Sequence, residues 1–132
     1  MENVMSKILA KLYRIFSGLW LGSILFFSGV IAPQIFRHLP KADAAGLQNQ
    51  LFPIYYAVGI FCGFALLTLD FLSKRKKLLI LLFATLIALI GFFYLSPQIR
   101  EAYLNQSLDM KWLHPLAVAL NILMLVLVLI AV

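Results

Sequence analysis

Four long and almost uncharged apolar runs decide what this chain can fold into. They cover residues 15–36, 51–72, 78–96 and 112–132, and Asp70 is their only formally charged residue. As a helix at 1.5 Å per residue, each run spans about 28–33 Å, which matches the roughly 30 Å hydrocarbon core of a bilayer. The amphipathic helices of soluble proteins carry a polar stripe, and these runs lack one. The sequence therefore predicts four transmembrane helices.

The composition excludes an ordinary water-soluble enzyme or binding module. Of the 132 residues, 64% are hydrophobic and 12% are charged, whereas about 25% are charged in a soluble domain. The mean hydropathy is +1.00. A soluble core of this length cannot hide so much apolar surface. We expect residues 1–132 to form one all-α domain, an integral membrane four-helix bundle.

The basic residues that flank the runs predict how the helices face. One side carries seven of them, Lys7, Lys11, Arg14, Lys74, Arg75, Lys76 and Lys77. The other side carries four, Arg37, Lys41, Arg100 and Lys111. Because the cytoplasmic side carries the excess of Lys and Arg, we expect both termini in the cytoplasm, in the inner membrane of a bacterium. The net charge of +6 then reflects topology, and we expect no nucleic-acid partner.

The segments between the runs are short. The second and third runs are joined by residues 73–77, of which Lys74, Arg75, Lys76 and Lys77 are called the basic loop below. Two interpretations of this loop stay open: it orients and anchors the helix ends, or it binds anionic lipid headgroups, at about 1 kcal/mol per basic residue. We expect a tight five-residue turn here. Segments 41–51 and 100–106 have a helix-forming composition, which predicts short helices in the outer connections.

The two halves of the chain resemble each other. The first run ends in Ala32-Pro33-Gln34-Ile35 and the third in Ser96-Pro97-Gln98-Ile99, and the second and fourth runs each have a proline near their start. Two spans per half predict a parallel repeat of two helical hairpins, related by an axis along the membrane normal. Duplication and a coincidence of helix-end prolines both remain open.

The prolines and several polar residues gather at the outer ends of the runs. Pro33 and Pro97 each deprive the carbonyl four residues earlier of its usual partner. If the halves are equivalent, these ends meet around one axis, where Tyr55, Tyr56 and His114 also lie. We therefore expect an outer vestibule that suits a small cation or a hydrogen-bonding headgroup, with His114 pointing into the bundle. Its expected residues are Pro33, Tyr55, Tyr56, Pro97, His114 and Asn121. An interfacial aromatic belt is the alternative for the tyrosines.

Two polar residues lie on one face of the fourth run. Asn121 follows His114 by seven residues, which is about two helical turns. Because an unpaired amide near mid-membrane is costly, Asn121 should hydrogen-bond to another helix. His114 precedes Pro115, so it either caps the helix or contacts a ligand, a proton or a substrate.

Asp70 is the candidate intramembrane charge. It lies three residues from the end of its run, and Lys74 follows at i+4 on the same face. A charge inside a span is a functional candidate by default. Two interpretations stay open: an interfacial ion pair with Lys74, or a proton or cation site.

Small residues at helical spacing predict close packing. Gly18 and Gly22 share a face of the first run, and Gly59 and Gly63 share a face of the second. Such faces allow helix backbones to approach, because lipid provides no hydrophobic force between helices. We expect this packing inside the bundle. A homo-oligomer or a membrane-protein partner is the alternative.

The sequence lacks motifs of catalysis or metal binding. Two histidines, one cysteine and four methionines occur without paired ligand spacing, and neither a glycine-rich phosphate loop nor a catalytic dyad is present. We therefore expect no catalytic residues, no cofactor, no metal site and no enzymatic activity.

Short motifs along the chain are similar to those of a known family. Trp20-x-Gly22, Phe26-Phe27 and Ala32-Pro33-x-x-Phe36 resemble the first-helix signature of the transmembrane-protein-205-like family. Later landmarks that resemble it are Phe52-x-x-Tyr55-Tyr56, Pro97, Leu113-His114 and Asn121. The resemblance implies a four-helix membrane protein of unknown biochemical role, loosely associated with metal or drug resistance. Pro115, Leu116 and Ala117 stand where that family has a small hydroxyl residue after the histidine.

Two classes of function follow. The first, which the resemblance favours, is transport of a small solute or metal, or assistance to a transporter, at the outer vestibule. The alternative is a noncatalytic membrane scaffold that binds another membrane protein through its small-residue faces. The sparse polar lining of the spans favours this alternative.

Overall fold

The computed structural model describes residues 2–104 and 110–132, and these contain helices and turns but no strand. The helices are α1 (Glu2–Phe26), η1 (Phe27–Ile31), α2 (Ala32–His38), α3 (Lys41–Ser73), α4 (Leu78–Ile90), η2 (Gly91–Leu95), α5 (Ser96–Leu104) and α6 (Met110–Ala131). The two short elements η1 and η2 are single π-helical turns that continue directly into the α-helices on either side.

Together these elements make four helices long and apolar enough to cross a membrane, over Val4–His38, Lys41–Ser73, Leu78–Ala102 and Trp112–Ala131. The predicted all-α four-helix membrane bundle is therefore confirmed. The chain is an integral membrane protein.

The connections differ from the prediction in two places. Residues 41–51 are the first turns of α3 and do not form a separate outer helix, because the helix continues through Pro53 without a break. Residues 100–104 likewise end α5, while 105 and 106 lie outside the described residues. The turn between α3 and α4 is the four-residue basic loop, one residue shorter than predicted.

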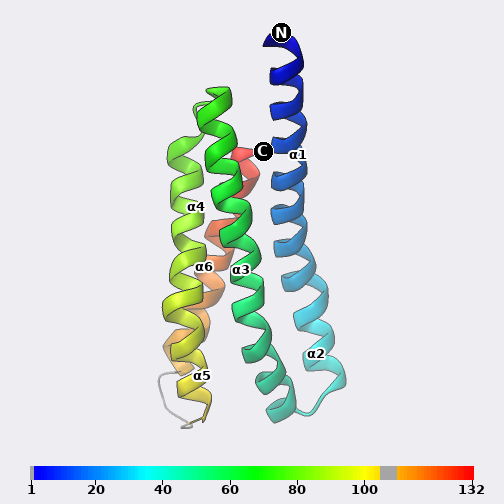
Figure 1. Ribbon diagram of the computed structural model, residues 1–132. Helices are drawn as coiled ribbons and strands as arrows, with labels where there is room; N and C mark the ends of the chain where they lie inside the picture. Colours follow the sequence, from blue (N-terminus) through cyan, green and yellow to red (C-terminus); the bar gives the residue numbers. More distant parts are fainter. Residues whose placement is uncertain (1, 105–109) are drawn as a thin grey trace.

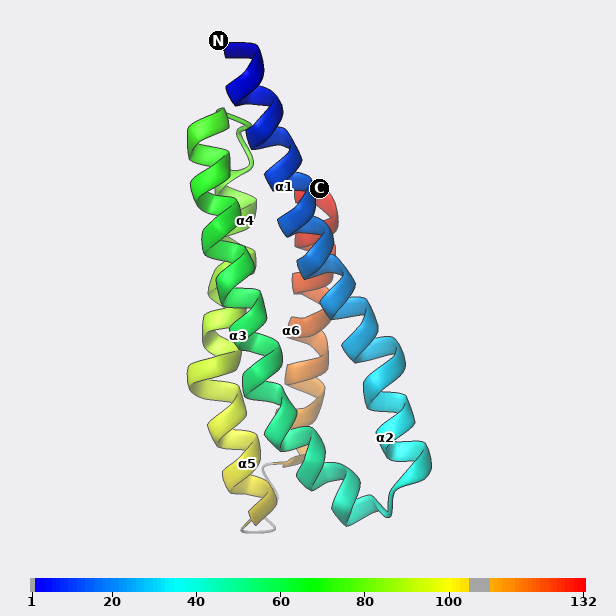
Figure 2. The same cartoon turned by 45° about the vertical axis from the view of Figure 1, so that its right-hand side comes forward.

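The four spans run alternately up and down around a square. Helix α1 packs on α3, α3 on α4, α4 on α6, and α6 back on α1 (Figure 1). Both termini and the basic loop lie at one end, here called the basic-loop end, and α2 and α5 lie at the other, the α2/α5 end. Toward the α2/α5 end, α2 leans away from α6 (Figure 2).

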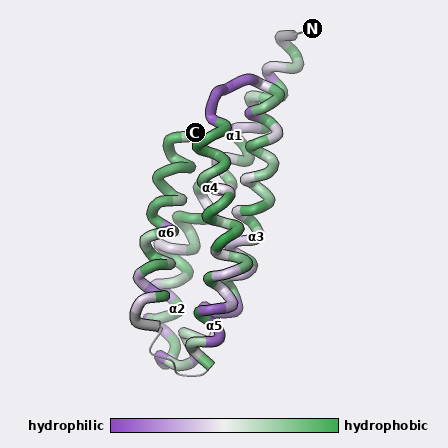
Figure 3. Tube along the Cα trace, turned by 90° about the vertical axis from the view of Figure 1, so that its left-hand side faces the viewer, coloured by the Kyte–Doolittle hydropathy of each residue, from purple (hydrophilic) through white to green (hydrophobic). Residues whose placement is uncertain are grey.

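The core is a column of large side chains along the bundle axis. Helix α1 contributes Tyr13, Trp20 and Ile24, all at most 1% exposed and spaced to lie on one face of the helix. The other spans meet them with fully buried residues such as Leu66, Leu81 and Met124. The outward faces are also apolar, so hydrophobic residues run along every span, and the strongest polar stretch is the basic loop (Figure 3). Such a surface suits hydrocarbon rather than water.

Both π-helical turns lie directly before an X-Pro dipeptide. Before Pro33, the Ala32 N–H donates to the Phe27 carbonyl, and before Pro97, the Ser96 N–H donates to the Gly91 carbonyl, each five residues back. A proline cannot donate an N–H and clashes with the carbonyl four residues earlier in an α-helix. The extra residue of a π turn relieves that conflict. The predicted half-repeat therefore has a local structural counterpart, because each helical hairpin contains a π turn at the same distance before its proline.

Candidate functional site

A chain of polar side chains links three of the four spans. The Tyr55 hydroxyl of α3 donates to Asn121 Oδ1 of α6. Asn121 Nδ2 donates in turn to Ser28 Oγ of η1 at 2.7 Å. This chain of Tyr55, Asn121 and Ser28 is called the polar triad below. The prediction that Asn121 hydrogen-bonds to another helix is confirmed, since it bonds to two.

Aromatic packing holds the triad in place. The Tyr55 ring stacks on Phe27 with centroids 4.4 Å apart and an interplanar angle of 15°. The neighbouring Tyr56 is 2% exposed, and its ring lies against the backbone of Gly91. Both tyrosines therefore point into the bundle and do not form part of an interfacial belt.

The rest of the predicted vestibule is not assembled. Pro33 and Pro97 are exposed, and so is His114, so the prediction that His114 points into the bundle is wrong. The buried face of α6 is set by Leu113 and Ala117, and His114 follows Leu113 by one residue, which turns it off that face. The structure brings Tyr55, Tyr56 and Asn121 together and leaves the other three residues outside.

Asp70 is 3% exposed and has a backbone partner. Its Oδ1 accepts the backbone N–H of Lys77 at 3.0 Å, just before the first turn of α4. Neither of the two interpretations given above, an ion pair with Lys74 or a proton or cation site, included this bond to Lys77. Lys74 ends α3 in a left-handed conformation, with φ of 55°. Asp70 therefore acts as the acceptor that joins the end of α3 to the start of α4.

The basic loop is also tied to the other two spans. The Arg75 guanidinium lies over the Tyr13 ring, 4.3 Å from its centroid. The Tyr13 hydroxyl donates to the Ala131 carbonyl at 2.7 Å, and Lys77 Nζ donates to the Ile130 carbonyl at 3.2 Å. Two of the four basic side chains therefore have structural contacts, on α1 and on α6.

The glycines divide into an inner and an outer set. A Cβ at Gly63 would collide with Thr85 and one at Gly91 with Tyr56, while one at Gly59 would lie 3.1 Å from Trp20 Nε1. A Cβ at Gly18, Gly22 or Gly29 would meet nothing within 4 Å. The prediction of packing inside the bundle is therefore confirmed for α3 and wrong for α1.

Sequence reasoning missed two features of these sites. The first is Ser28 as a partner of Asn121. The available signal was its hydroxyl group inside the first run, because a polar group there also needs a hydrogen-bond partner. The direction of the α1 glycines was also available from the periodicity, because they lie half a turn around the helix from Trp20 and Ile24, the large residues expected in a core.

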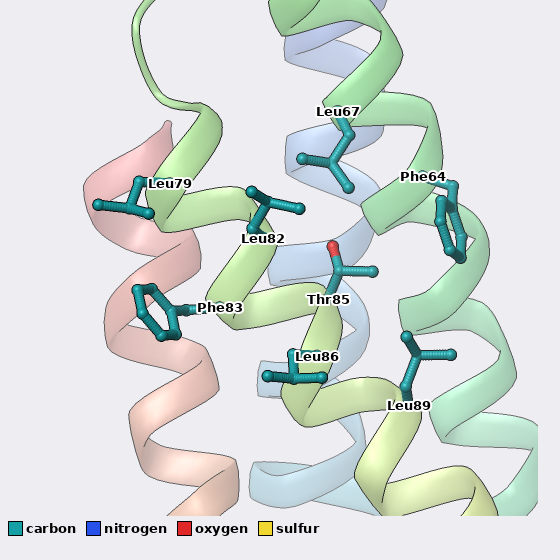
Figure 4. Close-up of a pocket in the computed structure, with 8 residues that line it drawn as sticks. All are labelled: Phe64, Leu67, Leu79, Leu82, Phe83, Thr85, Leu86 and Leu89. Carbon is teal, nitrogen blue, oxygen red and sulfur yellow. The ribbon is translucent and has the colours of Figure 1, made fainter.

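The seam between α3 and α4 carries a shallow apolar groove of about 360 Å³. Figure 4 shows the side chains that line it, with the Thr85 hydroxyl between the two helices. The lining residues are Phe64, Leu67, Leu79, Leu82, Phe83, Thr85, Leu86 and Leu89. Among the residues that the structure describes, no three His, Cys, Asp or Glu side chains gather as a metal site would require.

A family model for a domain of unknown function, DUF4149, matches residues 15–107. The chain belongs to this family. The matched segment contains the α1 glycines, the polar triad residues Ser28 and Tyr55, Asp70 and both π turns. Asn121 and His114 lie beyond it. No match was found among curated proteins or among solved structures.

A double-mutant cycle on this DUF4149 chain tests the triad. Tyr55→Phe leaves Asn121 Oδ1 without its donor, and Asn121→Leu removes the amide. We expect the two substitutions to be coupled by about 0.6–1.7 kcal/mol in the free energy of unfolding, measured by denaturant titration in micelles. The exposed Tyr94 provides the control, because Tyr94→Phe combined with Asn121→Leu should be additive. Additivity in the Tyr55 cycle would contradict the bond.

A second set of variants separates the two roles of Asp70. Asp70→Ala removes the acceptor for the Lys77 N–H, so it should destabilise the protein by about 1 kcal/mol, as the loss of a helix cap does. Lys74→Ala should change the free energy of unfolding by less than about 0.5 kcal/mol. Equal losses from the two single variants, without a further loss in the double variant, would instead establish the Asp70–Lys74 ion pair.

Proposed function

We propose that this protein is a noncatalytic membrane scaffold that associates with a second copy of itself through α1. The proposal rests on the open space beside Gly18 and Gly22 of α1 and Gly29 of η1, a surface here called the α1 glycine face. All three are exposed in a helix whose opposite face holds Tyr13 and Trp20 in the core.

Among the described residues, nothing packs over the glycines of that face. A glycine inside a helix costs about 1 kcal/mol relative to alanine, and each of these positions has room for a side chain. In a membrane, glycines spaced by four residues allow a second backbone to approach closely, which provides van der Waals contact that lipid does not replace. The α1 glycine face extends over the twelve residues from Gly18 to Gly29, about 16 Å of helix, which is long enough for a helix crossing.

A second copy suits this face better than an unrelated helix. Helix pairs with Gly-x-x-x-Gly are typically parallel, and copies inserted by the same topology rule present α1 in the same direction. A two-fold axis beside α1 then places the same glycines of both copies opposite each other, which gives a closed and self-complementary interface.

We place the scaffold in the inner membrane of a bacterium with both termini and the basic loop in the cytoplasm, as the seven-to-four distribution of basic residues supports. The exposed Lys74 and Lys76 are then available to anionic headgroups. Kinship with the transmembrane-protein-205-like family is part of this proposal. Transport, which that resemblance suggested, gains no support from the described residues, because the core is filled and His114 points outward.

Resonance energy transfer between copies labelled at the N-terminus tests the proposal in liposomes. Over a series of lipid-to-protein ratios, the parent chain should associate, and Gly22→Leu should weaken association by about tenfold or more, since a bulky side chain separates the two backbones. The matched control is Ala119→Leu, which adds a larger side chain at an exposed position of α6.

The control should associate as the parent chain does. Equal association of all three proteins would contradict a role for the α1 glycine face, and absence of transfer in the parent chain would contradict self-association itself.

A further inference from the structure

A second groove opens at the α2/α5 end, between the start of α3 and the η2–α5 segment. Its volume is about 550 Å³, which falls within the range of small-molecule sites. It is lined by Asn49, Pro53, Phe92, Phe93, Ser96, Pro97, Arg100, Glu101 and Leu104. The groove lies on a different face from the α1 glycine face, so its occupancy does not depend on self-association.

Two buried polar atoms in this groove lack partners. Asn49 is 9% exposed and Ser96 is 5% exposed. Within the described part of the chain, neither Asn49 Nδ2 nor Ser96 Oγ makes a hydrogen bond. A buried donor without a partner costs about 1–3 kcal/mol, so an amide and a hydroxyl that line the same groove indicate a polar ligand group between them.

Charges of both signs stand at the mouth of the groove. Arg100 lies one turn after Ser96 on α5, and Glu101 follows it, and both side chains are exposed. A guanidinium binds a phosphate through paired N–H groups, while a carboxylate accepts hydrogen bonds from an ammonium. Together with the Asn49 amide donor, these residues match a group that carries a phosphate and a primary amine.

The remaining wall is apolar and faces the membrane. Phe93 is 70% exposed, and it lies with Phe92 on the span side of Ser96. One turn earlier is Leu89, which already belongs to the apolar seam groove between α3 and α4. A ligand whose polar group sits between Asn49 and Ser96 can therefore extend an acyl chain along this seam into the hydrocarbon.

We propose that this groove binds a phospholipid with a phosphoethanolamine headgroup. Asn49 and Arg100 hold the phosphate, Glu101 holds the ammonium, and Phe92 and Phe93 contact the first part of an acyl chain. The depth of the groove in the membrane suits a headgroup. Arg100 and Glu101 lie at the end of the span Leu78–Ala102, which places their charges at headgroup level.

Native mass spectrometry of the whole chain in mild detergent tests this site. The probes are phosphatidylethanolamine, phosphatidylglycerol, phosphatidylcholine and the soluble glycerophosphoethanolamine, each added at matched concentrations. The parent chain should bind phosphatidylethanolamine about tenfold more tightly than the other two lipids, because only its headgroup offers an ammonium that donates hydrogen bonds. The soluble headgroup should bind more weakly, because it leaves the phenylalanine wall empty.

Three variants assign the contacts. Arg100→Gln should lower the affinity for phosphatidylethanolamine about tenfold, and Glu101→Gln should abolish the preference over phosphatidylglycerol. Arg37→Gln is the matched control, because Arg37 is an exposed arginine at the same end of the bundle but does not line the groove. Thermal unfolding of each variant establishes that the fold is retained.

Three results would overturn the proposal. The first is equal binding of the three lipids by the parent chain. The second is an unchanged affinity in Arg100→Gln, or an equal loss in Arg37→Gln. The third is binding of the soluble headgroup as tight as that of the lipid, which would assign the groove to a free phosphodiester.

Discussion

Close approach of helix backbones is the constraint on which this bundle depends. In lipid no hydrophobic force draws helices together, so contact must come from packing between small residues and from a few hydrogen bonds. Gly59 and Gly63 let α3 approach α1 and α4, and Gly91 leaves room for the Tyr56 ring. The polar triad then ties α3, α6 and η1 at one level. The same rule supports the proposed self-association, because the outward glycines of α1 leave room for another helix backbone.

The two ends of the bundle are built differently. At the basic-loop end, Asp70, Arg75 and Lys77 connect α3 and α4 to α1 and α6 through contacts to backbone atoms and to the Tyr13 ring. At the α2/α5 end, π turns carry the helices past Pro33 and Pro97, α2 leans outward, and buried polar atoms of α3 and α5 have no hydrogen-bond partner among the described residues. The proposed lipid site lies at this end.

Hydropathy was sufficient to predict the four spans, because a bilayer requires long apolar helices whose backbone groups are all satisfied internally. The same logic predicted that Asn121 bonds to another helix. Its partners Ser28 and Tyr55 depend on how the helices are rotated about their axes, and local sequence carries little of that information. The outward turn of His114 and the choice of the Lys77 N–H by Asp70 likewise follow from tertiary packing. The direction of Gly18 and Gly22 could have been found, because they lie opposite Trp20 on the helix.

Disulfide trapping in native membranes reports whether two copies of α1 meet at the α1 glycine face. In a Cys62→Ser background, single cysteines are placed at the exposed Ile15 and Leu25, which flank Gly18 and Gly22 on α1, and, as references, at the exposed Ile122 and Leu129 of α6. A disulfide forms only where two Cα atoms come within about 7 Å, so it reports the interface between copies. If two copies associate through α1, cross-linked dimers form from both α1 positions and none form from α6. Equal cross-linking at Ile122 or Leu129, or none at Ile15 and Leu25, would contradict self-association through α1.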